Sequence, residues 1–236
     1  MRTIAIWVFA ALSFIHVVAE MGKVAALSAW TKPWLMPLLA LWFWSVTSAK
    51  GRFLRSSLLA ALVFSTLGDM LLLFSHGVHG ELFFLLGLLA FLFAQVSYLG
   101  GFLAAVGKSK GFLHQSPLSG AALVVFLVGF LYWLWPSIPE GLQLPVAVYG
   151  AALVGMALSV LHARFRLGEV AFSQAMSGAM LFLLSDCLLA AARFGHPFAF
   201  SSAAIMATYL LGQWLLVRGA AVYLGGKSRK VAESSR

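Results

Sequence analysis

Eight long apolar stretches, separated by short polar connections, run along the chain of 236 residues. Most of them approach the length of about 20 apolar residues that a helix needs to cross the hydrocarbon core of a bilayer. Continuous apolar runs of this length are typical of transmembrane helices. The pattern therefore predicts an all-α, polytopic membrane protein with eight transmembrane helices, at residues 3–21, 34–48, 56–74, 81–106, 118–135, 145–162, 170–192 and 199–224.

Turn-forming residues mark the connections between these stretches. Lys32-Pro33 precedes the second predicted helix, glycines bound the connection at 77–80, and prolines bound the one at 136–145. These connections are too short to hold a folded insert. We therefore expect one transmembrane domain over residues 1–224, followed by a basic cytoplasmic tail at residues 225–236.

The composition supports the membrane assignment. Apolar residues make up 62% of the chain and charged residues 10%, and the mean hydropathy is +0.96. Soluble domains carry about 25% charged residues. We predict an integral membrane protein surrounded by membrane lipids, located in the inner (cytoplasmic) membrane of a bacterium.

Lysine and arginine are distributed unequally between the two sets of connections. With a cytoplasmic N-terminus, only Lys23, Lys32 and Arg193 fall on the outer side. Since cytoplasmic connections of membrane proteins carry an excess of basic residues, both termini are predicted to be cytoplasmic. The predicted cytoplasmic set is Arg2, Lys50, Arg52, Arg55, Lys108, Lys110, Arg164, Arg166, Arg218, Lys227, Arg229, Lys230 and Arg236.

The net charge of +9 is therefore mostly a topological signal, together with contact to anionic lipid headgroups. The basic residues are dispersed over several connections and form no ordered basic face. No nucleic-acid partner is expected.

Two aspartates, Asp69 and Asp186, lie inside predicted transmembrane helices. An ionised carboxylate at the centre of such a helix costs about 2.5 to 3.5 kcal/mol, so these residues usually mark a functional site. Both predicted helices run in the same direction, which places the two side chains at a similar depth near the outer side. Gly178 shares a helix face with Asp186 and permits close approach of another helix. A structural ion pair is the alternative explanation for either aspartate.

Other polar residues are expected at the same level of the membrane. Ser13, His16 and Glu20 share one face of the first predicted helix, Lys32 opens the second, and Tyr149 lies near the start of the sixth. Together they suggest one polar cavity in the outer leaflet. Structural roles for Glu20 and Lys32 are an equal alternative, because charged side chains near an interface can reach water.

A short string recurs around the two aspartates. A glycine or serine, the aspartate, one variable residue and two leucines recur 117 residues apart, and Gln95 and Gln213 follow 26 or 27 residues later. The recurrence suggests two four-helix halves of the same orientation. A chance match of short strings in a leucine-rich chain is the alternative.

These residues resemble the lysoplasmalogenase (YhhN-like) family of integral membrane proteins over nearly the whole chain. One position departs from the family pattern, because Gln95 stands where a histidine is expected, and a proton-transfer role is not expected there. The resemblance rests on Lys32-Pro33, Ser65 with Gly68-Asp69, the segment 87–98, Gly178-Ala179, Ser185-Asp186, Tyr209 and Gln213.

The resemblance implies an eight-helix hydrolase that cleaves the vinyl ether bond of lysoplasmalogens to a fatty aldehyde and glycerophosphoethanolamine or glycerophosphocholine. A vinyl ether hydrolyses by protonation of its β-carbon to an oxocarbenium ion, followed by attack of water, which requires an acid and a base. Asp69 and Asp186 can divide these roles, because desolvation and mutual repulsion keep one carboxyl group protonated while a nearby Lys32 holds the other ionised. Which aspartate is the acid stays open at this point.

Supporting roles follow from the same hypothesis. Lys32 is expected to bind the substrate phosphate. The other predicted substrate-binding residues, which position water or the glycerol hydroxyls or line the cavity, are Tyr149, Tyr209, Gln213, Ser65 and Glu20. The predicted partner is a lysophospholipid, and neither a metal nor another cofactor is predicted.

Two other functions compete with this hypothesis. In a metal-dependent membrane lipid hydrolase, an aspartate would bind zinc together with His16, His76, His79 or His196, although no His-x-x-x-His pair occurs. In a proton- or cation-coupled transporter or lipid flippase, the paired aspartates would bind the ion near the midplane between parallel repeats. A position of both aspartates towards the outer surface favours an enzyme pocket.

Overall fold

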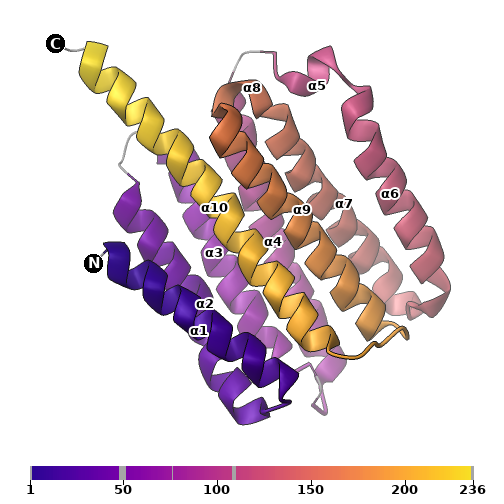
Figure 1. Cartoon of the computed structure of the whole chain (residues 1–236). Helices are drawn as coiled ribbons and strands as arrows, with labels where there is room; N and C mark the ends of the chain where they lie inside the picture. The colour runs from indigo at the N-terminus through magenta and orange to yellow at the C-terminus, as the bar shows by residue number, and fades with distance from the viewer. Residues whose placement is uncertain (1, 48–51, 76, 108–109, 235–236) are drawn as a thin grey trace.

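Long helices that run alternately in opposite directions form the bundle in Figure 1. The computed structural model describes residues 2–47, 52–75, 77–107 and 110–234. No strand occurs in these ranges, which confirms the predicted all-α class. The long helices are α1 (Arg2–Met21), α2 (Ala25–Val46), α3 (Arg52–Leu72), α4 (Gly80–Val106), α6 (Leu118–Leu134), α7 (Glu140–His162), α9 (Glu169–Arg193) and α10 (Ser201–Ser234), and the short ones are α5 (Phe112–Gln115), η1 (Trp135–Ser137) and α8 (Arg164–Leu167).

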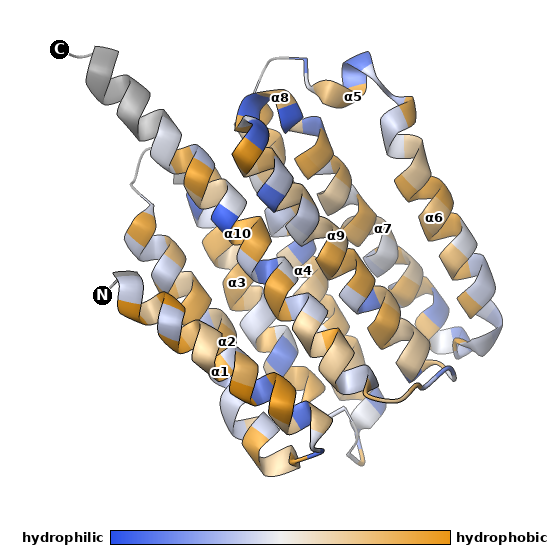
Figure 2. Ribbon diagram, in the orientation of Figure 1, coloured by the Kyte–Doolittle hydropathy of each residue, from blue (hydrophilic) through white to orange (hydrophobic). Residues whose placement is uncertain are grey.

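Seven of the described helical segments are long and apolar enough to cross a membrane, namely α1, α3, α4, α6 with η1, α7, α9 and α10. Figure 2 shows that hydrophobic residues dominate along their length. Large apolar side chains such as Trp7, Phe14, Val125 and Leu144 point outward and are exposed, as expected of surfaces in contact with lipid. The protein is therefore a polytopic integral membrane protein.

The remaining long helix, α2, has 22 residues and is long enough to cross a bilayer. Lys32, two prolines and several tryptophans lower its mean hydropathy below that of the other seven, so an eighth span stays a prediction. Both α2 and α7 begin earlier than the sequence predicts, and Pro33 and Pro145 lie inside them. Transmembrane helices tolerate proline because neighbouring groups satisfy the freed backbone carbonyls.

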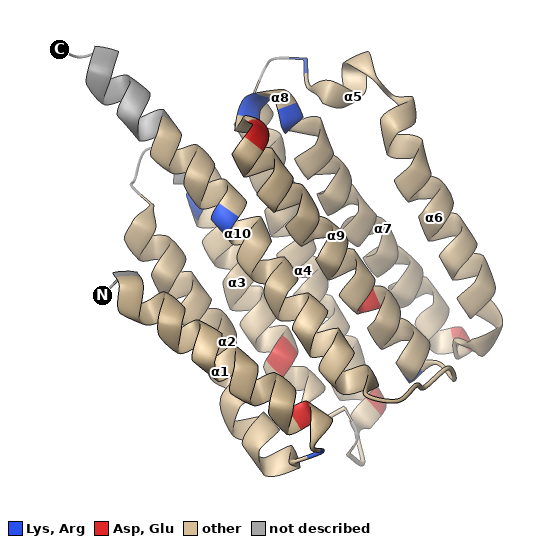
Figure 3. Ribbon diagram, viewed as in Figure 1, with Lys and Arg blue, Asp and Glu red and all other residues tan. Residues whose placement is uncertain are grey.

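Basic and acidic residues lie mostly at opposite ends of the bundle, as Figure 3 shows. Lysine and arginine gather at the end that holds α5 and α8, whereas most acidic residues lie toward the opposite end. By the excess of basic residues, the first end would face the cytoplasm. This orientation stays a prediction, and Lys50, Lys108 and Arg236 of the predicted cytoplasmic set lie outside the described residues.

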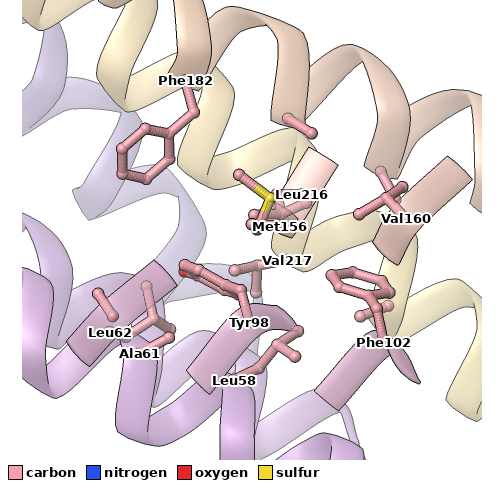
Figure 4. Close-up of a cluster of buried hydrophobic side chains, with 14 of the residues drawn as sticks. Leu58, Ala61, Leu62, Tyr98, Phe102, Met156, Val160, Phe182, Leu216 and Val217 are labelled. Carbon is pink, nitrogen blue, oxygen red and sulfur yellow. The ribbon is translucent and has the colours of Figure 1, made fainter. Parts of the chain in front are cut away.

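An apolar core fills the space between α3, α4, α7, α9 and α10, and Figure 4 shows side chains from these helices in contact there. Its fully buried members include Leu58, Tyr98, Phe102, Met156, Phe182 and Leu216. The backbones of α9 and α10 approach closely, because a Cβ added to Gly178 would lie 2.3 Å from the backbone nitrogen of Leu216. This confirms the close approach predicted for Gly178, and it fixes α9 and α10 against each other.

The helical backbone of α10 continues through Ser234, so most of the predicted tail at residues 225–236 extends that helix. The division into a domain and a tail stays a prediction.

Candidate active site

Asp69 lies near the end of α3 and is 3% exposed. The Nζ atom of Lys32 on α2 lies 3.9 Å from its Oδ1 atom. The hydroxyl group of Tyr209 on α10 donates a hydrogen bond to its Oδ2 atom at 2.9 Å. Three helices therefore bring a cation and a hydrogen-bond donor to this buried carboxyl group.

Asp186 on α9 has different surroundings. The hydroxyl group of Tyr149 on α7 donates a hydrogen bond to its Oδ2 atom, and the described residues give it no ion pair. The side chain is half-buried and borders a cavity of about 50 Å³ between α4, α7 and α9. Apart from Asp186 and Tyr149, the residues that line this cavity are apolar: Leu72, Phe84, Leu88, Phe91, Val146, Leu189, Ala190 and Phe194.

The surroundings of the two carboxyl groups meet at Phe91 on α4. Its ring contacts the ring of Tyr209 edge-on, with 6.0 Å between the centroids, and it also lines the cavity beside Asp186. Gly68 makes room for this ring, because a Cβ there would lie 2.6 Å from it. Phe91 thus belongs to the surroundings of both predicted carboxyl groups.

Gln213 and Ser65 lie one turn deeper and bond to the protein itself. The amide nitrogen of Gln213 donates to the hydroxyl oxygen of Ser65 at 3.0 Å. The hydroxyl group of Tyr98 donates to the amide oxygen of Gln213 at 2.5 Å. All three side chains are buried, so these contacts join α3, α4 and α10 beneath the carboxyl groups.

Glu20 belongs to a second polar cluster, between α1 and α2. Its carboxylate accepts a hydrogen bond from the hydroxyl group of Ser28 and lies 3.8 Å from Nε2 of His16. The Nδ1 atom of His16 lies 2.7 Å from the hydroxyl oxygen of Thr31. The next residue after Thr31 is Lys32, so this cluster adjoins the Asp69 side of the site.

Gln95 on α4 is a polar side chain of the site that makes no well-formed hydrogen bond within the described residues. It is completely buried, and neither its amide nitrogen nor its amide oxygen has a well-formed hydrogen bond to the described residues. The amide lies beside the hydroxyl group of Tyr149.

The histidines of the competing zinc hypothesis lie on separate elements. His16 is in the cluster of α1 and α2, His79 precedes α4, and the ring of His196 stacks on Trp133 at 4.5 Å. Within the described ranges, no three His, Cys, Asp or Glu side chains are grouped so that they could hold a metal ion. His76 lies outside the described residues.

Sequence reasoning missed several contact residues of the site. The hydroxyl groups of Ser28, Thr31 and Tyr98 bond to predicted site residues, and Phe91 links the two carboxyl surroundings. Ser28 and Thr31 precede Lys32 on a single helix face, and this spacing is a signal that could have identified them.

Comparison with known proteins places the chain in a family. Residues 27–220 match the YhhN family, which is most of the chain. This chain belongs to the YhhN family. The match confirms the resemblance seen in the sequence, and it includes both aspartates, Lys32, Tyr149 and Tyr209.

Curated relatives of this YhhN protein carry the name lysoplasmalogenase. Lysoplasmalogenase TMEM86A of Bos taurus is 28% identical over 198 residues, which cover 78% of this chain and 75% of the relative. The human protein of the same name is 28% identical over 196 residues, with the same coverage. A lysoplasmalogenase of Mycobacterium bovis is 33% identical over 141 residues, which cover 59% of this chain and 51% of the relative. No solved structure matches this chain significantly.

The region that matches the YhhN family begins after the first helix. His16 and Glu20 on α1 therefore lie outside it, whereas Ser28 and Thr31 on α2 lie within it.

Proposed function

We propose that this YhhN protein is a membrane-embedded hydrolase that cleaves the vinyl ether bond of lysoplasmalogens. The products would be a fatty aldehyde and glycerophosphoethanolamine or glycerophosphocholine. The names of the curated relatives support the substrate class, because two of them align over three quarters of their own length. The pair of carboxyl groups supports the reaction type, since vinyl ether hydrolysis needs both an acid and a base.

The substrate would reach the site from the surrounding lipid, in the inner membrane of a bacterium. The apolar cavity beside Asp186 offers contacts for the carbons next to the vinyl ether. Lys32, the cation nearest to Asp69, is suited to attract the phosphate of the headgroup. A lysophospholipid therefore matches the site with its chain towards Asp186 and its headgroup towards Asp69.

We assign the acid to Asp186 and the base to Asp69. The ammonium group of Lys32 and the hydroxyl group of Tyr209 both favour a negative charge on Asp69. Asp186 receives a single hydroxyl group and faces apolar side chains, surroundings that disfavour a negative charge. Unequal surroundings of this kind divide two carboxyl groups between acid and base roles.

The reaction then proceeds in two stages. Asp186 gives its proton to the β-carbon of the vinyl ether, and the double-bond electrons form the new C–H bond. The positive charge is shared by the α-carbon and the ether oxygen. Water attacks the α-carbon while Asp69 takes one of its protons, which yields a hemiacetal.

Breakdown of the hemiacetal restores both residues. Asp186, now ionised, takes the proton of the hemiacetal hydroxyl group, and Asp69 gives its proton to the glycerol oxygen. The C–O bond breaks, and the aldehyde and the glycerophospho alcohol leave. Asp186 is again protonated and Asp69 again ionised, so no external proton is consumed.

The observation that carries this proposal is that Asp69 and Asp186, on two separate helices, have unlike partners and share Phe91 in their surroundings. The test is aldehyde release from an ethanolamine lysoplasmalogen by the purified protein in detergent. General acid and base groups each contribute about 100-fold to 10,000-fold, so Asp69→Asn and Asp186→Asn should each lower kcat by that order. Full turnover in either folded variant would disprove the pair.

Detergent solution also separates hydrolysis from transport, because it provides no gradient and no second compartment. Thermal unfolding of each variant should match that of the wild type, which shows that lost activity does not reflect lost fold. Absence of aldehyde from a well-folded wild-type protein would favour the transporter or flippase hypothesis, and flux across proteoliposomes would be measured next.

A further inference from the structure

Gln95 differs from every other residue of the site in its hydrogen bonding. It is completely buried on α4, and neither the oxygen nor the nitrogen of its amide makes a well-formed hydrogen bond in the described chain, although the Tyr149 hydroxyl group lies next to it. Buried polar groups in native proteins are almost always hydrogen-bonded. An amide without well-formed hydrogen bonds, next to the tyrosine that bonds to Asp186, is therefore a candidate ligand-binding group.

The position of Gln95 on its helix supports this reading. Phe84, Leu88 and Phe91 line the cavity beside Asp186, and Gln95 follows Phe91 by four residues on the same face of α4. Its amide also lies beside the Tyr149 hydroxyl group that bonds to Asp186. Gln95 thus lies one turn beyond the residues that line the cavity, on the same face of α4.

Gln213 is a useful comparison because it occupies the corresponding place after the other aspartate. Its amide nitrogen bonds to Ser65 and its amide oxygen accepts from Tyr98, so both of its groups are used within the protein. Gln95 has the same chemistry without those partners. The difference assigns a structural role to Gln213 and leaves Gln95 able to bind a ligand.

We propose that the Gln95 amide recognises the free hydroxyl group at the sn-2 carbon of the substrate glycerol. A hydroxyl group both donates and accepts, so it can pair with the amide oxygen and the amide nitrogen at once. The ether oxygen and the phosphate oxygens only accept, and the alkenyl chain does neither. Gln95 would then select lysolipids, which carry this hydroxyl group, over lipids acylated at the same carbon.

Water is the other group that both donates and accepts. In the proposed reaction the attacking water must contact the base, Asp69, whereas Gln95 lies on the Asp186 side of the site beside Tyr149. The sn-2 carbon is next but one to the ether oxygen, so a substrate whose vinyl ether contacts Asp186 brings its hydroxyl group to that side. The substrate hydroxyl therefore fits the position of Gln95 better than the attacking water does.

This inference rests on the proposed hydrolysis, and the test separates the two. It compares an ethanolamine lysoplasmalogen with its 2-deoxy analogue, which lacks only the sn-2 hydroxyl group. A site built to bond a hydroxyl group discriminates strongly against its absence, so wild-type kcat/KM should fall by at least about 100-fold with the analogue. Gln95→Leu keeps the approximate size of the side chain, and its kcat/KM values for the two substrates should differ by less than about threefold.

Gln174→Leu is the matched control. The amide oxygen of Gln174 is also buried without a partner, but the residue lies three turns from Asp186 along α9. The ratio of kcat/KM for the lysoplasmalogen to kcat/KM for the 2-deoxy analogue should be the same in Gln174→Leu as in the wild type.

Three results would overturn the inference. The inference is overturned if the wild-type protein cleaves both substrates equally well, and this result needs no variant, so it holds even if Gln95→Leu fails to fold. If Gln95→Leu lowers kcat/KM equally for both substrates, Gln95 instead binds the attacking water or serves packing. Aldehyde from neither substrate would overturn the proposed function and this inference with it.

Discussion

The two halves of the bundle repeat one order of helices but surround their aspartates differently. A shift by 117 residues, the separation of Asp69 and Asp186, places α1 on α6, α2 on α7, α3 on α9 and α4 on α10. The same shift relates Lys32 to Tyr149, and each of these contacts the aspartate of its own half. The helix positions and these contacts support the duplication suggested by the sequence.

The differences between the halves are chemical. Asp69 receives a cation from α2 and the hydroxyl group of Tyr209 from the opposite half. Asp186 receives a neutral hydroxyl group from α7. When Gln213 is aligned with Gln95, the residue of the opposite half that corresponds to Tyr209 is Phe91, which has no hydroxyl group. One helical frame used twice can thus hold two carboxyl groups in unequal surroundings, which acid–base catalysis requires.

The first helices of the halves also differ. α1 carries His16 and Glu20, which bond to α2. At the place of His16, α6 has Trp133, and only Gly120, Leu123 and Leu134 of α6 are buried. The polar cluster therefore exists beside Asp69 alone, whereas α6 is mainly a lipid-facing helix.

Among the features that differ between the halves, loss of the cation should have the largest effect. Lys32→Met leaves the Asp69 carboxylate buried without a counter-charge, so the base is lost and kcat should fall by about 100-fold to 1,000-fold. Lys32→Arg, which keeps the charge, should stay within about tenfold of the wild type. The measurement is the separate determination of kcat and KM for aldehyde release. An increase in KM at unchanged kcat would instead limit Lys32 to phosphate binding.

The helix contacts of the two halves should differ in their tolerance of a methyl group. A Cβ on Gly178 would meet the backbone of α10, whereas one on Gly68 would meet the ring of Phe91, a side chain that can shift. Gly178→Ala should destabilise the protein by about 2 to 3 kcal/mol, and Gly68→Ala by less. Thermal unfolding in detergent measures both, and equal shifts in Tm would contradict the difference in packing.

Much of the helical frame could be predicted from the sequence, because apolar composition decides helix formation in lipid. The seventh stretch, predicted at residues 170–192, is α9 at Glu169–Arg193. The starts of α2 and α7 could not be predicted, since Pro33 and Pro145 end helices in water more often than in a membrane.

The candidate site could be predicted in part for a similar reason. Intramembrane carboxyl groups are rare, so Asp69 and Asp186 stand out in the sequence. The donors to them depend on which helices become neighbours. Tyr209 lies far along the chain from Asp69 and reaches it only because α10 packs beside α3, and the missing partners of Gln95 depend on the same packing.

The two tyrosines offer a smaller and more direct comparison. Tyr149→Phe removes the hydroxyl group that bonds to Asp186, whereas after Tyr209→Phe the Asp69 carboxylate keeps Lys32. Asp186 becomes charged when it gives up its proton, and Tyr149 then donates the hydrogen bond that stabilises this charge. Since a hydrogen bond to a charged group contributes about 1.5 to 3 kcal/mol, activity should fall by about tenfold or more in Tyr149→Phe and by less in Tyr209→Phe. The kcat values for aldehyde release measure this order, and the reverse order would argue against the assignment of acid and base.

The smallest effect is expected in the polar cluster that only the first half possesses. Glu20 bonds to Ser28 and lies near His16, and no contact joins it to Asp69 in the described chain. If Glu20 takes part in substrate binding, its carboxylate would act from outside the immediate surroundings of Asp69, by attracting the ammonium group of the headgroup. The Glu20 side chain is 22% exposed, and ion pairs that water can reach contribute less than about 1 kcal/mol. Glu20→Gln should therefore raise KM by about threefold and leave kcat unchanged. The effect should disappear at high salt, because salt screens such interactions. A loss of kcat by more than tenfold would instead make the α1 cluster part of the catalytic machinery and would extend the difference between the halves to the chemistry itself.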